Sequence, residues 1–294
     1  MLEVAQRPQV ERAPTGALRA RLGEGRWHFQ HGPIDLVVGA EGDAESVCAF
    51  VEAAWARMQT ILGELVRELS VLRAPVAAGV LRGPVARRME AACLPHCVQF
   101  ITPMAAVAGA VADELIACAR EYRGLLRAHV NNGGDIALHL APGARYRVGL
   151  FADLGRIERR ERWRFDGDAE ICFDTPVRGV ATSGWRGRSF SLGIADSVTV
   201  LARTAAQADA AATMIANAVN VDHPAIARRA AVSLKDDSDL GARLVTVEVP
   251  ALPAALIERA LEAGSAHAHA LQARGVVQSA VLWLQGRART VGSP

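Results

Sequence analysis

VATSGWRGRSFSLGIADSVTVLARTAAQADAAAT, residues 180–213, is the stretch of sequence that decides the fold. It begins within an apolar run that predicts a strand over 178–182, and the run SVTVLA predicts a second strand over 197–202. The segment that follows directly, 204–219, predicts a helix. Two strands and a helix therefore follow one another closely, and a loop rich in glycine and serine joins the strands.

The chain before this stretch has its own strand and helix signals. Short apolar runs over 17–38, broken by Gly-Glu-Gly at 23–25 and by Gly-Pro at 32–33, predict three strands joined by tight turns. Asp43 is placed to cap a helix over 45–69, whose apolar residues recur at spacings of three and four. The first third of the chain thus predicts a small antiparallel meander followed by a long amphipathic helix.

A second helix is expected over 102–122, with Pro103 in its first turn and Thr102 as its cap. Its alanines and Gly109 give it a thin face, which another backbone or a ligand could approach closely. The turn NNGGD at 131–135 then joins two predicted strands. This turn and the thin helix face are the first candidates for positions where a ligand could approach the backbone.

The order of all elements indicates the α+β class. Strands and helices alternate too irregularly for a doubly wound parallel sheet, and several strand pairs have the signals of hairpins. We therefore predict mixed or antiparallel sheets with packed helices. Residues 1–15 lack periodicity and predict a flexible N-terminal arm, and residues 16–294 predict a single domain.

The composition excludes several classes of function. The chain has 294 residues, 33 basic against 31 acidic, and a net charge of +2, which provides no field for steering toward nucleic acid. No apolar run reaches the length of a membrane span, and none near the N-terminus resembles a signal peptide, so we expect a cytoplasmic protein without membrane contact. Lys235 is the only lysine and follows no phosphate-loop glycines, which argues against Schiff-base and Walker-type enzymes.

Three segments, in this order, resemble the motifs of the ApbE superfamily. MAAVAGAVAD at 104–113 is similar to the start of a family helix, NGGDI at 132–136 to the Gly-Gly turn against the flavin nucleotide, and ATSG at 181–184 to a serine-glycine strand end. ADAAAT at 208–213 fits the family's Ala-Asp-x-x-x-Thr metal motif. The form of the first motif and the turn DSDLG at 237–241 resemble an uncharacterised (UPF) cytoplasmic branch of this superfamily.

The resemblance covers about residues 100–220 and implies an ApbE-like fold. The best-known members split FAD and transfer FMN to a threonine or serine of a target protein. The resemblance therefore implies a small-molecule nucleotide or flavin as the binding partner, FAD or a related nucleotide as a cofactor, and magnesium as the metal. The expected chemistry is metal-assisted phosphoryl or nucleotidyl transfer.

Asp209 and Thr213 also have an independent physical interpretation. They are four residues apart on a predicted helix and share one face, so a carboxylate and a hydroxyl can converge on a hard cation such as Mg²⁺. As the resemblance implies, the backbone carbonyl near Ala106 would complete the protein ligands. The alternative is that Asp209 is an ordinary acid of the first helical turn and Thr213 a buried threonine.

Two further segments are candidates for binding the nucleotide. Gly133 and Gly134 could let backbone N–H groups approach a pyrophosphate, while Asp135 could hold a hydroxyl or a metal-bound water. The alternative is a simple hairpin turn. A second candidate is the strand end with its hydroxyls and free amide, which could bind phosphate or form only another turn, and its residues are Thr182, Ser183 and Gly184.

The sequence departs from the flavin transferases at two points. Ala108 stands where they have a lysine, and their His-x-x-Asp-Pro segment is missing between the serine-glycine element and the next strand. Arg186 and Arg188 could replace part of the phosphate neutralisation, but guanidinium groups are poor in proton transfer. We therefore predict binding without standard FMN transfer, and no catalytic residue is assigned.

Two other functions stay open from the sequence. Cys93 and Cys97 flank His96 and could serve a sulfur-transfer or assembly factor, although no second pair provides zinc-site spacing. The other alternative is a structural homo-oligomer, with a homodimer as its simplest form. The sequence decides neither the substrate nor the pathway.

Overall fold

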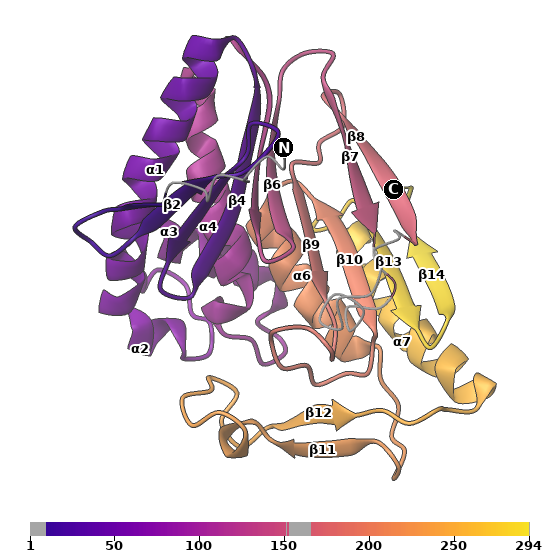
Figure 1. The fold of residues 1–294 in the computed structure, drawn as a ribbon. Coiled ribbons are helices and arrows are strands. Elements are labelled where there is room, and N and C mark those ends of the chain that lie inside the picture. The colour runs from indigo at the N-terminus through magenta and orange to yellow at the C-terminus, as the bar shows by residue number, and fades with distance from the viewer. Residues whose placement is uncertain (1–9, 151, 153–165, 294) are drawn as a thin grey trace, which may run out of the picture.

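The protein is built on a ten-stranded sheet in which every neighbouring pair is antiparallel (Figure 1). The computed structural model describes residues 10–150, 152 and 166–293. In order across the sheet, the strands are β1 (Val10–Arg12), β2 (Leu18–Arg21), β3 (Trp27–His31), β4 (Ile34–Gly42), β5 (Leu125–Asn132), β6 (Asp135–Leu140), β9 (Gly179–Ser183), β10 (Ser197–Ala202), β13 (Ser279–Leu284) and β14 (Arg287–Val291). The predicted α+β class is confirmed.

The helices cover one face of this sheet, as Figure 1 shows. They are α1 (Ala44–Arg67), α2 (Leu69–Leu72), α3 (Pro84–Cys93), α4 (Val107–Ile116), α6 (Ala205–Ala218) and α7 (Ala254–Ala273). The 3₁₀ turns are η1 (Leu94–His96), η2 (Pro103–Ala106), η3 (Ala117–Glu121) and η4 (Ala231–Ser233). No helix in the described ranges combines the length and hydropathy needed to cross a bilayer.

Two small two-stranded sheets complete the fold. The first joins β7 (Arg145–Leu150) to β8 (Gly167–Cys172) and packs on the face of the large sheet opposite to the helices. Along β9, Val180 contacts this side while Ala181 contacts α6, as the alternation of a strand requires. The second joins β11 (Ala227–Ala230) to β12 (Leu244–Glu248) and lies below the large sheet in Figure 1.

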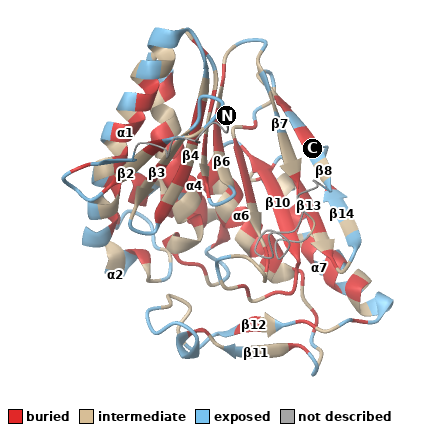
Figure 2. Ribbon diagram, in the orientation of Figure 1, coloured by how far each residue is buried: buried red, intermediate tan, exposed pale blue. Residues whose placement is uncertain are grey.

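Burial follows this layered arrangement. Figure 2 shows buried residues concentrated in the central strands and on the inner faces of the helices. All six residues of β10 are buried, because α6 covers one face of the strand and the β7–β8 side covers the other. The core lies between the large sheet and its helices, so the helices that carry the site motifs are held by extensive apolar contact.

The long helix after the first meander forms as predicted. The strands β2, β3 and β4 are consecutive antiparallel neighbours, and Asp43 then caps α1 by accepting a hydrogen bond from the Ser46 amide at 2.8 Å. Its apolar stripe is buried against the sheet, and the buried residues are Phe50, Val51, Ala54, Trp55, Met58, Ile61 and Leu65. Local sequence signals were sufficient here because cap, turn and apolar stripe all agree.

The N-terminal prediction needs a correction. Residues 10–12 of the predicted flexible arm form β1, which pairs with residues 18–20 of β2. The three residues are exposed, so no alternation of apolar residues in the sequence predicts this strand. Residues 1–9 of the predicted arm lie outside the described residues.

The predicted cap of the second helix is also different in the structure. Thr102 does precede the turn η2, but its side chain accepts no capping hydrogen bond; its hydroxyl instead contacts the carboxylate of Asp239. Asp239 lies in the loop of the β11–β12 sheet, and in the same loop Asp237 pairs with Arg73 at 2.6 Å. The acidic turn therefore connects the β11–β12 sheet to the residue before η2 and to the end of α2.

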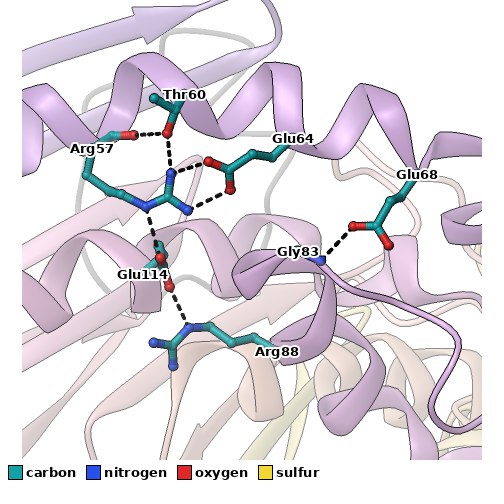
Figure 3. Close-up of polar contacts among 7 residues, drawn as sticks. All are labelled: Arg57, Thr60, Glu64, Glu68, Gly83, Arg88 and Glu114. Carbon is teal, nitrogen blue, oxygen red and sulfur yellow. Dashed lines mark hydrogen bonds and ion pairs between the residues drawn. The ribbon is translucent and has the colours of Figure 1, made fainter.

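A network of ion pairs ties three helices together (Figure 3). The guanidinium of Arg57 in α1 donates to both carboxylate oxygens of Glu64 at 2.7 Å and, through Nε, to Glu114 of α4 at 2.9 Å. Arg88 of α3 donates to the other oxygen of Glu114 at 2.9 Å. Because these side chains are at least partly buried, the pairs are less screened by solvent than surface pairs, and they fix α4 relative to its neighbours.

Three glycines allow the large sheet, α4 and α6 to approach one another closely. A Cβ at Gly109 would lie 2.3 Å from the Ala205 carbonyl oxygen, and one at Gly179 would lie 2.1 Å from the Thr204 carbonyl carbon. A Cβ at Gly193 would lie 2.0 Å from the carbonyl oxygen of Ala216, near the other end of α6. The thin face predicted around Gly109 is therefore occupied by the backbone of α6.

Gly179→Ala tests this packing. We expect a loss of at least about 2 kcal/mol in the free energy of unfolding, because backbone atoms cannot yield as a flexible side chain can. Gly23→Ala is the matched control, since a Cβ there meets no atom within 4 Å, and it should change stability by less than about 0.5 kcal/mol. Urea denaturation of both variants measures the difference, and equal stability of the two would contradict the tight packing.

Candidate functional site

The candidate site is built around the first turn of α6. Thr204 caps the helix by accepting a hydrogen bond from the Gln207 amide at 3.2 Å. The buried carboxylate of Asp113, in α4, accepts hydrogen bonds from the amides of Ala205 and Ala206, each at 2.9 Å. An acid at this position satisfies free amides and interacts favourably with the helix dipole. These bonds fix the start of α6 against α4.

The next turn of α6 carries the predicted metal ligands. Asp209 accepts a hydrogen bond from the Gly109 amide at 3.0 Å, so its carboxylate faces the beginning of α4. Thr213 follows one helical turn later on the same side of α6 and is half-buried. Ala106 is buried in η2, which packs against α6. Neighbouring elements thus carry all three residues, and their role as ligands stays a prediction.

The Gly-Gly turn lies beside this helix pair. Gly133 and Gly134 have φ values of 66° and 115° and form the two-residue connection between β5 and β6. The Gly134 amide donates to the side chain of Asn131 at 2.9 Å, so it is already engaged within the hairpin. The side chain of Asn132 donates to the Ala108 carbonyl at 3.1 Å and holds the turn against α4. The turn is thus a hairpin attached to the first motif.

Two carboxylates, Asp135 after the turn and Asp209 on α6, influence each other through their charges. Asp135 accepts a hydrogen bond from the Thr182 amide at 3.3 Å, and burial raises the pKa of Asp135 above its usual range. Burial also raises the pKa of Asp209 far above its ordinary value, and the charge of Asp135 raises it further, whereas the Gly109 amide lowers it. The two acids therefore lie close enough to repel each other when both are ionised.

This arrangement suits a hard cation. A divalent ion would compensate the repulsion between Asp135 and Asp209 and favour their ionised forms. The described ranges contain no group of three or more His, Cys, Asp and Glu side chains arranged to hold a metal. Mg²⁺ does not require such a group, because it commonly binds one or two carboxylates and keeps water or phosphate oxygens as its other ligands.

The predicted strand end contributes mainly to packing. Thr182 shares a hydrogen bond of 2.9 Å with the hydroxyl of Thr199 on the neighbouring strand. A Cβ at Gly184 would lie 2.5 Å from the Asp196 carbonyl oxygen, so this glycine allows two backbone segments to meet. Ser183 is half-buried at the last residue of β9. Binding of phosphate by these three residues stays a prediction.

The chain is similar to known protein families and proteins over most of its length. A model of the family described as AbpE bacteria matches residues 19–290. The chain belongs to this family. A UPF0280 protein of Methanopyrus kandleri is 34% identical over 206 residues, which cover 69% of this chain and 78% of that protein. A UPF0280 protein of Methanospirillum hungatei is 37% identical over 122 residues, covering 41% of this chain and 46% of that protein.

The solved structures that resemble this chain are more distant in sequence. The flavinyl transferase ApbE of Pseudomonas stutzeri has a TM-score of 0.44 and 14% identity, covering 97% of this chain and 95% of that one. The ApbE protein of Thermotoga maritima has a TM-score of 0.38 and 17% identity, covering 85% and 76%. The resemblance to the UPF branch of the ApbE-like superfamily is confirmed by the family and the archaeal relatives, and no activity follows from these structures.

Asp113 has a structural role at the candidate site that the sequence does not predict. It is the last residue of the first motif, and in the structure it holds the N-terminus of α6. Burial raises its pKa, while the amides of Ala206 and Ala205 lower it. The available signal is an acid within an alanine-rich helix, and nothing local indicates its partner 92 residues later in the chain.

The cysteine alternative gains no support from the structure. Cys93 is fully buried, and its thiol donates to the Thr102 carbonyl at 3.4 Å. Burial raises the pKa of this thiol strongly, so the reactive thiolate is disfavoured. Cys97 is exposed, so the two cysteines of the predicted pair lie in different environments. His96 between them is buried, and burial lowers its pKa to about 4.

Asp209→Asn should stabilise the cation-free protein. The pKa of Asp135 is raised to about 7 and that of Asp209 is raised as well, so above pH 3.8 the folded protein binds more protons than the unfolded chain. The contribution of this pair to the free energy of unfolding of the wild type therefore falls as the pH rises from about 4 to about 7. The variant removes the repulsion and should lose less stability over this window.

Thermal unfolding in chelator at several pH values measures this difference. We expect the variant to melt above the wild type at pH 7 and to approach it near pH 4. Asp236→Asn, a change of the same kind at an exposed acid, should leave the pH dependence unchanged. A variant that is less stable than the wild type at pH 7 would contradict the prediction, because it would show that the Asp209 carboxylate stabilises the fold in the absence of a cation.

Proposed function

We propose that this protein binds FAD or a related dinucleotide together with Mg²⁺, at a site formed by the Gly133 turn, the start of α4 and the first three turns of α6. The observation that carries the proposal is the placement of two acids: the Gly109 amide holds Asp209 toward the start of α4, and Asp135, directly after the glycine turn, raises the pKa of Asp209 through its charge. Natural proteins keep such destabilising arrangements mainly where a ligand uses them. The family membership supports a flavin nucleotide as the ligand.

The residues present fit a bound magnesium ion. Asp209 would provide a carboxylate oxygen and Thr213 a hydroxyl, and the Ala106 carbonyl lies on the neighbouring turn η2. When bound, the ion would neutralise charge on phosphate oxygens and polarise them. The Gly109 amide orients Asp209 through its hydrogen bond, and Asp113 holds the helix that presents it. These two residues thus position the carboxylate without touching the ligand.

The proposed chemistry is metal-assisted phosphoryl or nucleotidyl transfer, without standard FMN transfer to protein. Ala108 offers no charged side chain at the position where the family's transferases have lysine, and its carbonyl accepts from Asn132. The loop after β9 contains no histidine that could activate an incoming hydroxyl. The ground-state contacts for a dinucleotide are retained, whereas the groups for proton transfer are not.

Magnesium-dependent binding of FAD is the first test. We expect isothermal titration to give an affinity at least about tenfold higher in Mg²⁺ than in chelator, since the ion offsets the charge of two carboxylates and a diphosphate. Asp209→Asn should abolish this dependence, and Asp236→Asn should keep it. Equal affinity with and without Mg²⁺ in the wild type would refute the metal site, and absence of FAD binding would refute the proposed function.

Protein flavinylation is the second test. Incubation with FAD, Mg²⁺ and a peptide that carries the acceptor threonine motif of ApbE transferases should give no FMN adduct in mass spectrometry, because no group activates the hydroxyl. The same mixture with an authentic transferase is the positive control. Multiple-turnover labelling that disappears in Asp209→Ala would contradict the proposal and restore transferase activity.

A further inference from the structure

We infer that Arg188 binds a phosphate group of the ligand over the Gly133 turn and makes the site selective for phosphorylated ligands. The inference rests on the proposed nucleotide site and assigns to it a residue outside the family motifs. Four observations carry it: the contact with the turn, the anchoring of the loop, the free guanidinium and the distribution of charge.

The guanidinium of Arg188 lies directly on the Gly-Gly turn. A Cβ at Gly133 would be 3.2 Å from Arg188 Nη1 and 3.8 Å from its Cζ, so the missing side chain of the glycine is what leaves room for the guanidinium. The two residues belong to loops that are far apart in sequence, the β5–β6 turn and the connection between β9 and β10. Tertiary structure alone brings them together.

The loop that carries Arg188 is held at both ends. At its start the Trp185 amide donates to the Ala195 carbonyl at 3.0 Å, across the base of the loop. Toward its end the Leu192 amide donates to the side chain of Asn217, on α6, at 2.8 Å. The Ser191 carbonyl also accepts a bond from an amide of β12 at 2.9 Å. An anchored loop presents Arg188 to the turn at a smaller entropic cost than a free loop would.

The guanidinium is available for a ligand. Arg188 is exposed, and within the described part of the chain it forms no hydrogen bond or ion pair. Arg186 of the same loop differs, because its guanidinium lies over the Trp185 ring at 4.7 Å from the centroid. A guanidinium offers a planar fork of N–H donors that matches two phosphate oxygens, which a single ammonium cannot match in the same way.

The distribution of charge defines the class of ligand. The Gly133 turn leads directly into Asp135, whose charge raises the pKa of Asp209, and Arg188 lies against Gly133, so acids and a guanidinium both border this turn. A cation at the acids and a guanidinium at Gly133 would together suit a polyanion bound at the turn. The ligand class is therefore a compound with a diphosphate, such as a dinucleotide, rather than an uncharged flavin or nucleoside.

The experiment compares FAD, FMN and riboflavin, which share the isoalloxazine ring and carry two, one and no phosphate groups. Titrations in Mg²⁺ with Arg188→Gln should show an affinity for FAD lowered by at least about tenfold, as expected for a lost hydrogen-bonded charge, and an unchanged affinity for riboflavin. Arg188→Lys keeps the charge without the fork and should recover part of the loss. Arg229→Gln, at an exposed arginine of β11, is the matched control and should bind all three ligands like the wild type.

Inorganic pyrophosphate distinguishes the inference from the proposed function. If the wild type binds pyrophosphate but not FAD, and Arg188→Gln abolishes this binding, the phosphate site stands and the flavin proposal fails. Binding of FAD that is unchanged in Arg188→Gln would overturn the inference and leave the proposed function intact. An equal loss for FAD and riboflavin would also overturn it, because it would indicate a structural role. Binding of neither FAD nor pyrophosphate by the wild type would overturn both.

Discussion

The bonds between Asp113 and the first amides of α6 are the interaction on which the rest of the structure depends. The acid is buried in α4 and accepts from Ala205 and Ala206, so the two helices meet with a fixed rotation and height. Gly109 and Gly179 make this contact sterically possible, because any Cβ would collide with the backbone of residues 204–206. A helix held so closely cannot slide, and the position of every residue along its site-facing side is set.

The candidate site follows from this fixed helix. One turn after the anchored amides, Asp209 faces the Gly109 amide and comes close to Asp135 from the sheet. The repulsion between these acids destabilises the folded state. The packing around them offsets this effect, because the glycine contacts and the buried Asp113 hold α6 in place. The fold thus provides the stability, and the site retains the charge that a cation and a phosphorylated ligand would balance.

Local sequence signals predicted most of the elements correctly. The Asp43 cap, the Gly-Gly hairpin and the strand over 197–202 each depend on residues within one short segment, and the structure has all three. The prediction failed where the decisive partner was distant: Thr102 contacts Asp239 instead of capping η2. Residues 10–12 pair as an edge strand although all three are exposed. Neither contact can be predicted from the spacing of apolar residues in the sequence around it.

The sequence by itself determined the α+β class, the family and the residue types of the site, because periodicity, turn chemistry and motif spacing are written in consecutive residues. Only the tertiary structure decided that Asp113 holds α6, that Asp135 and Asp209 repel each other, and that Arg188 lies on Gly133. These three relations join residues between 55 and 92 positions apart in the chain. Their geometry depends on how whole helices and strands pack, and packing is a property of all the contacts together rather than of any one segment.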